Sequence, residues 1–204
     1  MSDKVIFKKR IFPIIFMLVI TLVFISVTTV IYTFTQDKIK INETLVMKRA
    51  ILGAAGYEIP SVATEVEKLY KDAVSEVKDQ NDKALYYIIT KPDSLEVQGY
   101  VIISTGSGLW GDITAAIGID NSKEELTGIE IIDQNETPGL GGRITESWFK
   151  YQFRGKRGPL SLVLEGDLTD KNQIQAITGA SYSSAAMKAI VNSTLAEAQN
   201  IIKS

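Results

Sequence analysis

Two hydroxyl residues flank a Gly-Ala pair in the stretch Thr178-Gly179-Ala180-Ser181. Apolar side chains recur at helical spacing after this stretch, so it is predicted to open a long helix. The unpaired N–H groups and partial positive charge of a helix N-terminus can bind a phosphate, and a glycine followed by a small residue leaves room for one. Ser and Thr are also common helix caps with no other role. The tetrapeptide alone favours a simple cap, so a ligand-binding role needs support from elsewhere in the chain.

A second candidate is the glycine-rich stretch Glu136-Thr137-Pro138-Gly139-Leu140-Gly141-Gly142. The Pro-Gly pair favours a tight turn. Glycines on both sides of Leu140 would let the backbone approach a flat ligand closely. The alternative interpretation is an ordinary connecting loop.

A third stretch, Gly106-Ser107-Gly108-Leu109-Trp110-Gly111, fits the G-x-G-x-x-G pattern of dinucleotide-binding sites. In such sites the pattern follows a strand and opens a helix. Here the residues that follow resemble another strand, which argues against dinucleotide binding. We expect a glycine-rich hairpin connection, with Trp110 available to cover a pocket.

The amino-acid composition limits the kinds of reaction and cofactor that the chain can support. The chain of 204 residues has a formal net charge of −2, which does not suggest a nucleic-acid partner. It contains no cysteine and no histidine, which excludes disulfides, thiolate nucleophiles, cysteine-ligated clusters and imidazole-ligated metal or haem. No catalytic residue and no metal site are predicted. Any redox chemistry would therefore come from an organic cofactor.

Residues 11–36 carry no charge and consist largely of apolar residues and threonine. Such a helix exceeds the ~30 Å hydrocarbon core of a membrane. It is longer than the apolar region of a signal peptide and lacks a small-residue cleavage site, so we predict one uncleaved transmembrane helix. Four basic residues precede it and should stay in the cytoplasm: Lys4, Lys8, Lys9 and Arg10. The predicted domains are a cytoplasmic segment 1–10, a membrane helix 11–36 and an extracytoplasmic domain 37–204.

The extracytoplasmic residues are predicted to form one domain of helices and strands. Apolar periodicity indicates two helices before the C-terminal one. The first runs from Lys38 to about Ala55, with Gly53 and Gly56 weakening or ending it, and the second is capped by Ser61 and has an apolar stripe from Val62 to Val77. A short helix is also predicted over Thr145–Phe153. The predicted strands are Ala84–Ile89, Gln98–Ser104, Ile113–Ile119, Thr127–Asp133 and Leu160–Glu165. Consecutive strands without intervening helices indicate an antiparallel sheet flanked by helices, an α+β fold.

Taken together, the stretch 136–141, Trp148, Gly155-Lys156 and the stretch 178–181 resemble the covalent FMN-binding domain. That domain occurs in the G subunit of the Rnf electron-transport complex and in the C subunit of the sodium-pumping NADH:quinone reductase. The resemblance includes the single N-terminal anchor and covers nearly the whole chain. Chain length favours the Rnf subunit.

The resemblance implies a membrane-anchored flavoprotein electron carrier, part of a translocase in the cytoplasmic (inner) membrane that couples ferredoxin–NAD electron transfer to ion movement. The last hydroxyl residue of the family's [Ser/Thr]-Gly-Ala-[Thr/Ser] motif forms a phosphoester with FMN, attached by a dedicated flavin transferase. The matching residue here is Ser181. The expected cofactor-binding residues around it are Thr178, Gly179, Ala180, Glu136, Thr137, Leu140, Gly141 and Trp110.

The chain departs from the family pattern at two positions, and two alternative functions stay open. The acceptor is Ser where these proteins usually have Thr, and Gln175 stands where the family often has Asp, so FMN could be held without a covalent bond. The first alternative function is the C subunit of the quinone reductase or a stand-alone surface flavoprotein. The second is a cofactor-free, membrane-anchored binding module.

Overall fold

The computed structural model describes residues 10–92, 94, 96–164, 166 and 168–202. The chain divides into two units, with the boundary between Thr44 and Leu45. Of the predicted cytoplasmic segment 1–10, all but Arg10 lies outside the described residues. Each unit is described by itself below.

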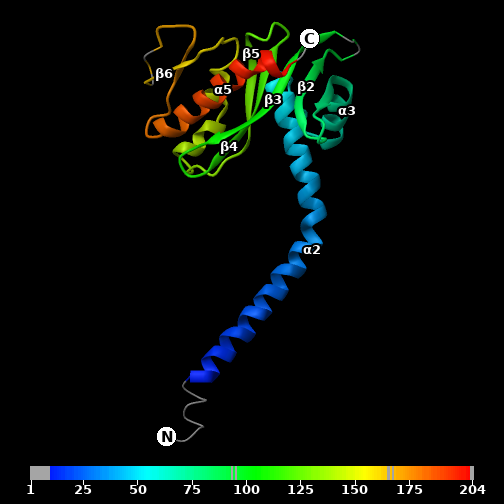
Figure 1. The fold of residues 1–204 in the computed structure, drawn as a ribbon, viewed down its shortest axis with the longest axis vertical. Coiled ribbons are helices and arrows are strands. Elements are labelled where there is room, and N and C mark those ends of the chain that lie inside the picture. The colour runs from blue at the N-terminus through cyan, green and yellow to red at the C-terminus, as the bar shows by residue number, and fades with distance from the viewer. Residues whose placement is uncertain (1–9, 93, 95, 165, 167, 203–204) are drawn as a thin grey trace, which may run out of the picture. The chain divides into compact units, whose positions relative to one another are not determined.

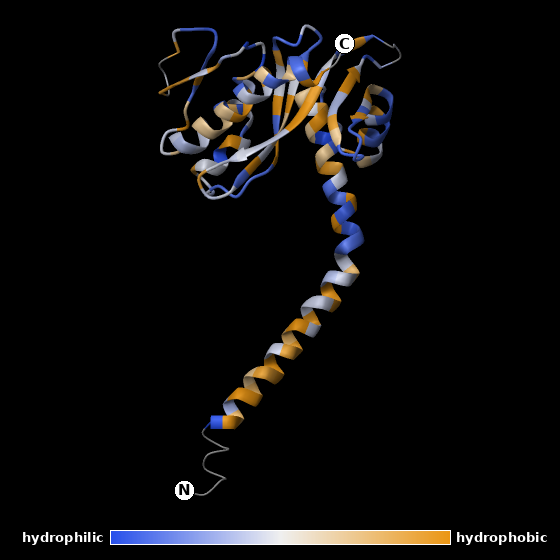
Figure 2. Ribbon diagram, in the orientation of Figure 1, coloured by the Kyte–Doolittle hydropathy of each residue, from blue (hydrophilic) through white to orange (hydrophobic). Residues whose placement is uncertain are grey.

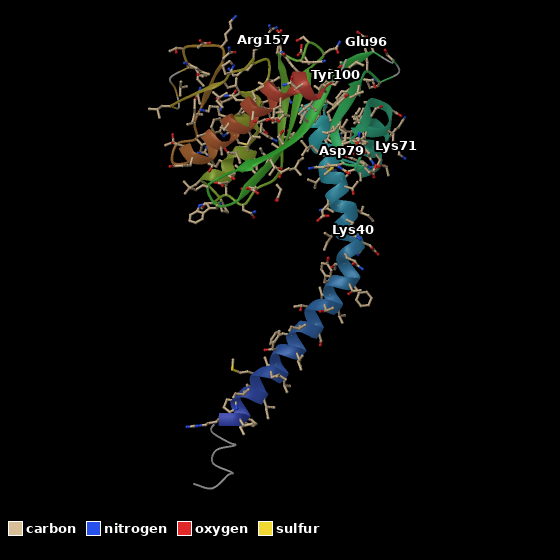
Figure 3. All side chains as sticks on the ribbon, viewed as in Figure 1. Lys40, Lys71, Asp79, Glu96, Tyr100 and Arg157 are labelled. Carbon is tan, nitrogen blue, oxygen red and sulfur yellow. The ribbon has the colours of Figure 1, made fainter. Side chains whose placement is uncertain are left out.

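Helix α2 (Phe12–Ala54) covers all but the first residue of the predicted membrane helix 11–36, and the predicted continuation up to Ala54, as one element. Its apolar stretch is the long orange segment of Figure 2, followed by a hydrophilic stretch that includes Lys40, labelled in Figure 3. An 18-residue window of α2 has a mean hydropathy of 2.9 and contains no buried residue. Hydroxyls in this stretch donate to backbone carbonyls one turn back, as Thr21 does to Met17 at 2.8 Å. The hydroxyl donors are therefore hydrogen-bonded within the helix. By length and composition, α2 can span a membrane.

The second unit is built on a five-stranded sheet in which neighbouring strands are also consecutive in sequence (Figure 1). The strands are β1 (Val74–Lys78), β2 (Ala84–Thr90), β3 (Val97–Ser107), β4 (Asp112–Asp120) and β5 (Leu126–Asp133). Every pair is antiparallel. The antiparallel α+β prediction is confirmed, and β2 to β5 contain the four strands predicted there.

The predicted helix after Ser61 is wrong at both ends. Helix α3 (Ala63–Ala73) begins after Val62, which provides no capping side chain, and the carbonyl of Ser61 instead accepts a bond from Arg49 at 3.0 Å. At the other end, Val74 and Val77 belong to β1, where Val74 pairs with Ile89 of β2. Two valines three residues apart fit a helix by spacing alone, but β-branched side chains also suit a strand, and pairing with β2 decides the outcome.

The predicted strand Leu160–Glu165 is shorter in the structure and does not join the main sheet. Strand β6 (Ser161–Val163) pairs in parallel with β7 (Gln173–Gln175), which the sequence did not predict. Glu165 lies outside the described residues. A three-residue strand with one apolar residue, Ile174, shows no alternation that would reveal it.

Alternation along β2 and β3 divides the core between the two faces of the sheet. Tyr86 and Ile102 face the larger core, which includes helix α5 (Ser181–Ile201), the red helix of Figure 1. Tyr87 and Val101, one residue along, face the core formed with the end of α2. This is the period-two pattern of a sheet buried on both faces.

The last turn of α2 packs directly on the backbone of β4. A Cβ added at Gly118 would lie 2.0 Å from the carbonyl oxygen of Ala54. The same oxygen accepts a hydrogen bond from Thr127 Oγ1 of β5 at 2.7 Å. Gly118 therefore permits a contact between helix end and sheet that a side chain would exclude.

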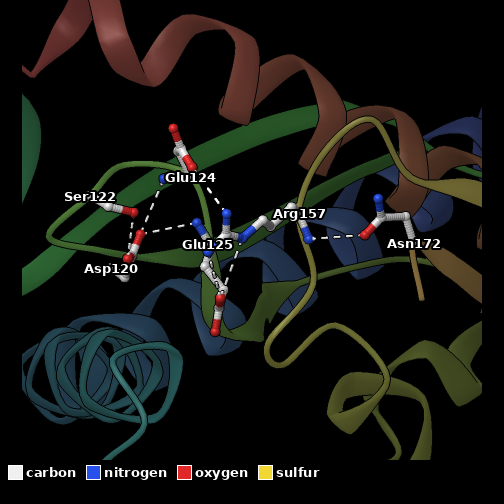
Figure 4. Close-up of polar contacts among 6 residues, drawn as sticks. All are labelled: Asp120, Ser122, Glu124, Glu125, Arg157 and Asn172. Carbon is white, nitrogen blue, oxygen red and sulfur yellow. Dashed lines mark hydrogen bonds and ion pairs between the residues drawn. The ribbon is translucent and has the colours of Figure 1, made fainter.

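The β4–β5 turn is held by Asp120 and by Arg157 from a distant loop (Figure 4). Asp120 Oδ1 accepts the N–H groups of Glu124 at 3.1 Å and Glu125 at 3.0 Å. The Arg157 guanidinium reaches the carboxylates of the same two residues at 3.2 and 3.3 Å. These contacts attach the segment before β6 to the end of the sheet.

Candidate functional site

Helix α5 begins at Ser181, with Ala180 in the N-cap position and no side chain capping it. The first N–H groups of a helix have no intrahelical acceptor. The first turn of this 21-residue helix contains no acidic residue. The result is a helix N-terminus whose amides and partial positive charge are suited to an anion.

A tight turn directly precedes this helix. The N–H of Ala180 donates to the carbonyl of Ile177 at 2.9 Å, with Gly179 at φ +80° between them. Such a turn requires a residue that tolerates positive φ, which explains the glycine. Buried Ser184 fixes the turn, since its hydroxyl accepts the N–H of Ile177 and donates to the carbonyl of Ala180, both at 3.0 Å.

The glycine-rich stretch also forms the predicted tight turn. The N–H of Leu140 donates to the carbonyl of Thr137 at 3.1 Å, and Gly139 has φ +75°. The chain then enters a short 3₁₀ helix, η2 (Gly141–Thr145), and α4 (Ser147–Tyr151), in place of the predicted single helix Thr145–Phe153. The structure brings the two turns together, because a Cβ on Gly179 would lie 3.3 Å from Leu140 Cδ2.

Glu136 connects three segments at this site. Its side chain is 5% exposed. One carboxylate oxygen accepts the backbone N–H groups of Leu109 at 2.7 Å and Trp110 at 3.1 Å, and the other accepts the hydroxyl of Ser183 in α5. The carboxylate thus ties the β3–β4 connection to the first turn of α5.

Two glycines make room for this carboxylate. A Cβ at Gly108 would lie 2.5 Å from Glu136 Oε1, and one at Gly141 would lie 2.6 Å from Glu136 Oε2. Burial raises the pKa of the Glu136 carboxyl, but the bonds from Ser183, Trp110 and Leu109 outweigh it, so the pKa lies below the ordinary 4.5. Glu136 is therefore an ionised acceptor whose oxygens are engaged within the protein.

Large apolar side chains are exposed in the segments that Glu136 connects. Trp110 is 70% exposed, Tyr182 76% and Leu140 47%, and Leu109 is also exposed. The sequence selected Trp110 and Leu140, but it missed Leu109, Tyr182 and the buried Ser183. The position of Tyr182 next to Ser181 was the available signal for that residue, whereas Ser183 could not be told from any other serine in the first turn.

The selected hydroxyls differ in accessibility. Thr178 and Ser181 are exposed, whereas Ser183 and Ser184 are buried. The hydroxyl of Ser183 donates to Glu136, and that of Ser184 donates to the carbonyl of Ala180. Thr137 is exposed and contributes its carbonyl to the turn, and Gly179 is exposed beside Leu140. Within the described part of the chain, no group of three or more Asp or Glu residues is arranged to hold a metal ion.

Comparison with known proteins bears on this site directly. Residues 108–196 match the FMN-binding domain, a range that contains the Trp110 turn, the Glu136 loop and the start of α5. The G subunit of the Na⁺-translocating ferredoxin:NAD⁺ oxidoreductase complex of Acetobacterium woodii is 31% identical over 88% of this chain and 85% of its own length. The G subunit of the ion-translocating oxidoreductase complex of Methanosarcina acetivorans is 31% identical over 92% of each chain. The chain belongs to this G-subunit family.

The fold of this G-subunit family member is shared more widely. The crystal structure of the C subunit of the Na⁺-translocating NADH-quinone reductase from Parabacteroides distasonis matches it with a TM-score of 0.66. The match covers 83% of this chain and 98% of that one at 20% identity, so it shows a common fold.

Gln175 of this G-subunit family member lies in β7 and has a structural role. Its side-chain oxygen accepts the N–H of Gly166 at 3.1 Å, and its backbone N–H donates to the side chain of Gln152 at 2.7 Å. These bonds connect the loop after β6 and the segment after α4 to the strand that leads into the turn at Gly179.

The residues present fit FMN. The uncapped start of α5 suits the phosphate, and the exposed side chains of Trp110, Leu140 and Tyr182 suit the flat apolar ring. Both carboxylate oxygens of Glu136 already accept hydrogen bonds from the protein, and its contact with the ligand stays a prediction.

Proposed function

We propose that this chain is a membrane-anchored flavoprotein electron carrier, one part of a complex that couples ferredoxin–NAD electron transfer to ion translocation. FMN would supply the redox chemistry, and the chain would hold and orient it. The chain itself contributes no catalytic residue, and translocase activity would belong to the assembled complex. Its partners would be the other membrane subunits, with the domain 37–204 outside the cytoplasm, on the far side of the inner membrane.

We further propose that a flavin transferase attaches FMN to Ser181 through its phosphate. The hydroxyl oxygen would bond to the flavin-side phosphorus of a flavin dinucleotide, the P–O–P bond would break, and the nucleoside monophosphate would leave. The observation that carries this proposal is an exposed hydroxyl on the first residue of an uncapped, 21-residue helix. Of the neighbouring hydroxyls, those of Ser183 and Ser184 are buried at 1% and 0% exposure and bonded elsewhere. Thr178 is the remaining competitor, three residues before Ser181 and also exposed.

The proposal gives each part of FMN a set of residues. The phosphodiester would keep one negative charge at the N-terminus of α5, worth ~0.3–1 kcal/mol if exposed and up to ~2 if partly buried. Gly179 and Ala180 would leave space for it, and Thr178 would lie beside it. Leu140, whose N–H is bonded to the carbonyl of Thr137, would contact the ring together with Trp110, and Thr137 and Gly141 would lie beside it.

The test is to co-express the full-length chain with a flavin transferase, denature it, and look for fluorescence on the gel and for FMN on a peptide by mass spectrometry. Ser181→Ala should abolish the fluorescent band. Ser147→Ala is the matched control, because Ser147 is also exposed and is the first residue of a helix. A band that survives Ser181→Ala, or FMN found on Thr178, would contradict the assignment.

The same experiment separates the alternatives. FMN that is present in the native protein but lost on denaturation would indicate non-covalent binding. In that case Gln175→Asp, which restores the residue common in the family, should permit attachment. A native protein without any flavin would support a cofactor-free binding module. Co-purification with the other subunits of a quinone reductase would favour that complex over the ferredoxin–NAD one.

A further inference from the structure

The β3–β4 connection places two large apolar side chains on the surface. Leu109 is 52% exposed and Trp110 is 70% exposed. We call Leu109 and Trp110 the tip. The backbone of the tip is bonded to Glu136, because both N–H groups donate to Glu136 Oε1. Gly108 is also bonded across the turn, its N–H donating to the carbonyl of Gly111 at 2.8 Å.

The other oxygen of the same carboxylate reaches α5 two residues beyond Ser181. Ser183 is 1% exposed, and its hydroxyl donates to Glu136 Oε2. The tip and the first turn of α5 are therefore both bonded to one buried side chain. A group with acceptor sites on two oxygens can fix two donors in a defined relative position, and bonds to a charged acceptor are stronger than neutral ones.

The surrounding backbone is shaped to this arrangement. At Gly108 and Gly141 a methyl group would overlap the two carboxylate oxygens, one glycine for each oxygen. Such close approach from two sides leaves the side chain little freedom to adopt another rotamer. The carboxylate is thus enclosed by the parts that it connects.

We propose that Glu136 is a positioning residue that holds the Leu109–Trp110 tip against the first turn of α5, so that Trp110 faces a flavin attached at that turn. The part that concerns the flavin rests on the proposed function. The part that concerns the tip does not, because it follows from the bonds within the protein. Glu136 does not contact the ligand in this arrangement and acts through the backbone of the tip and through Ser183.

The first test needs no flavin. The chain has two tryptophans, so Trp148→Phe leaves Trp110 as the only tryptophan in the full-length protein in detergent, and excitation near the red edge of the absorption band avoids the tyrosines. In that background Glu136→Ala should lower the residual fluorescence anisotropy of Trp110, because the tip loses its anchor. Glu136→Gln should fall between the parent and the alanine variant, since its amide oxygen can still accept the two N–H groups and its NH₂ can donate to Ser183. Parent-like anisotropy in a folded alanine variant would overturn the proposal.

The second test uses the flavin-loaded, full-length protein. A tryptophan held against the isoalloxazine quenches its fluorescence, so Trp110→Phe should raise the flavin emission. Glu136→Ala should remove most of the same quenching while FMN stays on Ser181. The double variant should emit little more than either single variant, because both changes remove the same contact between Trp110 and the flavin. Additive increases would overturn the coupling between Glu136 and Trp110. A parent protein without flavin would refute the proposed function but leave the first test in force.

A third variant covers the case in which Glu136→Ala does not fold, as judged by circular dichroism. Ser183→Ala keeps the carboxylate and its bonds to the tip, and removes the bond to α5. It should raise flavin emission by less than Trp110→Phe does, because the tip stays ordered but is no longer tied to the helix. Emission equal to that of the parent would then overturn the proposal.

Discussion

Glu136 accepts its hydrogen bonds as a carboxylate, and this links the stability of the fold to pH. Because its pKa is lower in the folded protein than the ordinary 4.5, its contribution to the free energy of unfolding is fully present above about pH 4.5. It is lost as pH falls through the folded-state pKa. Asp120 acts with the same sign, since its bonds from Ser122 and the turn amides outweigh burial and lower its pKa below 3.8.

We therefore expect Glu136→Gln to lower the free energy of unfolding by about 1.5 kcal/mol at pH 7. The difference from the parent should shrink as pH falls below 4.5, because the parent then protonates the same group. The measurement is urea unfolding of the full-length protein in detergent at several pH values, with Glu58→Gln, an exposed carboxylate, as the control for net charge. A difference that stays constant down to about pH 3 would show that ionisation of Glu136 does not support the fold.

The residues of the site could be predicted where their local sequence fits only one backbone conformation. Gly139 and Gly179 follow from the turns they form, and both have positive φ. The partnership of Glu136 with Ser183 was not predictable, because these residues are 47 positions apart and a buried carboxylate looks like a surface one in sequence. The same holds for Leu109, whose exposure depends on how the β3–β4 connection is anchored.

At the scale of elements, the contact between α2 and β4 depends on the missing side chain of Gly118. Gly118→Ala would place a methyl group 2.0 Å from the carbonyl oxygen of Ala54, and neither backbone can yield easily. We expect a loss of about 3 kcal/mol in the free energy of unfolding. Gly128→Ala is the matched control in the next strand, where the nearest atom is the same oxygen at 3.1 Å.

Urea unfolding of both variants beside the parent measures this contact. Gly128→Ala needs a shift of a few tenths of an ångström and should cost about 1 kcal/mol. Equal stabilities for the two variants would mean that the end of α2 moves away from the sheet without cost. That result would contradict the close packing of Ala54 on β4.

The elements themselves were predictable where one pattern ran long enough. Strands β2 to β5 have seven or more residues each, and alternation or a buried apolar run defines them. The failures are short. Strand β1 has five residues and follows α3 without a loop, so Val74 and Val77 continued a helical pattern by chance. Strands β6 and β7 have three residues each, too few for any period to show.

At the scale of the whole molecule, a single helix belongs to both units of the chain. Its N-terminal part is apolar and exposed, whereas Ala50 to Ala54 are buried in the core of the second unit. A helix end that is part of a core cannot leave it without unfolding that core. The membrane orientation of the helix therefore decides on which side the folded unit and its flavin site operate.

We expect the folded unit to lie outside the cytoplasm. The basic residues Lys4, Lys8, Lys9 and Arg10 precede the apolar stretch, and the charges after it are mixed, with Asp37 beside Lys38 and Lys40. Lysine and arginine near a membrane helix remain on the cytoplasmic side. Protease added to intact cells stripped of their outer membrane should digest the chain beyond Asp37, and inside-out vesicles should protect it.

Replacing the four basic residues with asparagine tests whether they set this orientation. Part of the population should then insert the other way, and protease should leave that part intact in stripped cells. The control replaces Lys38 and Lys40, which follow the apolar stretch, with asparagine. It should leave digestion complete, because the basic residues before the apolar stretch still outnumber those after it. Full protection of the unaltered protein would reverse the orientation. It would place the flavin on the cytoplasmic side, where a lost cofactor could be replaced and a covalent bond to Ser181 would confer less advantage.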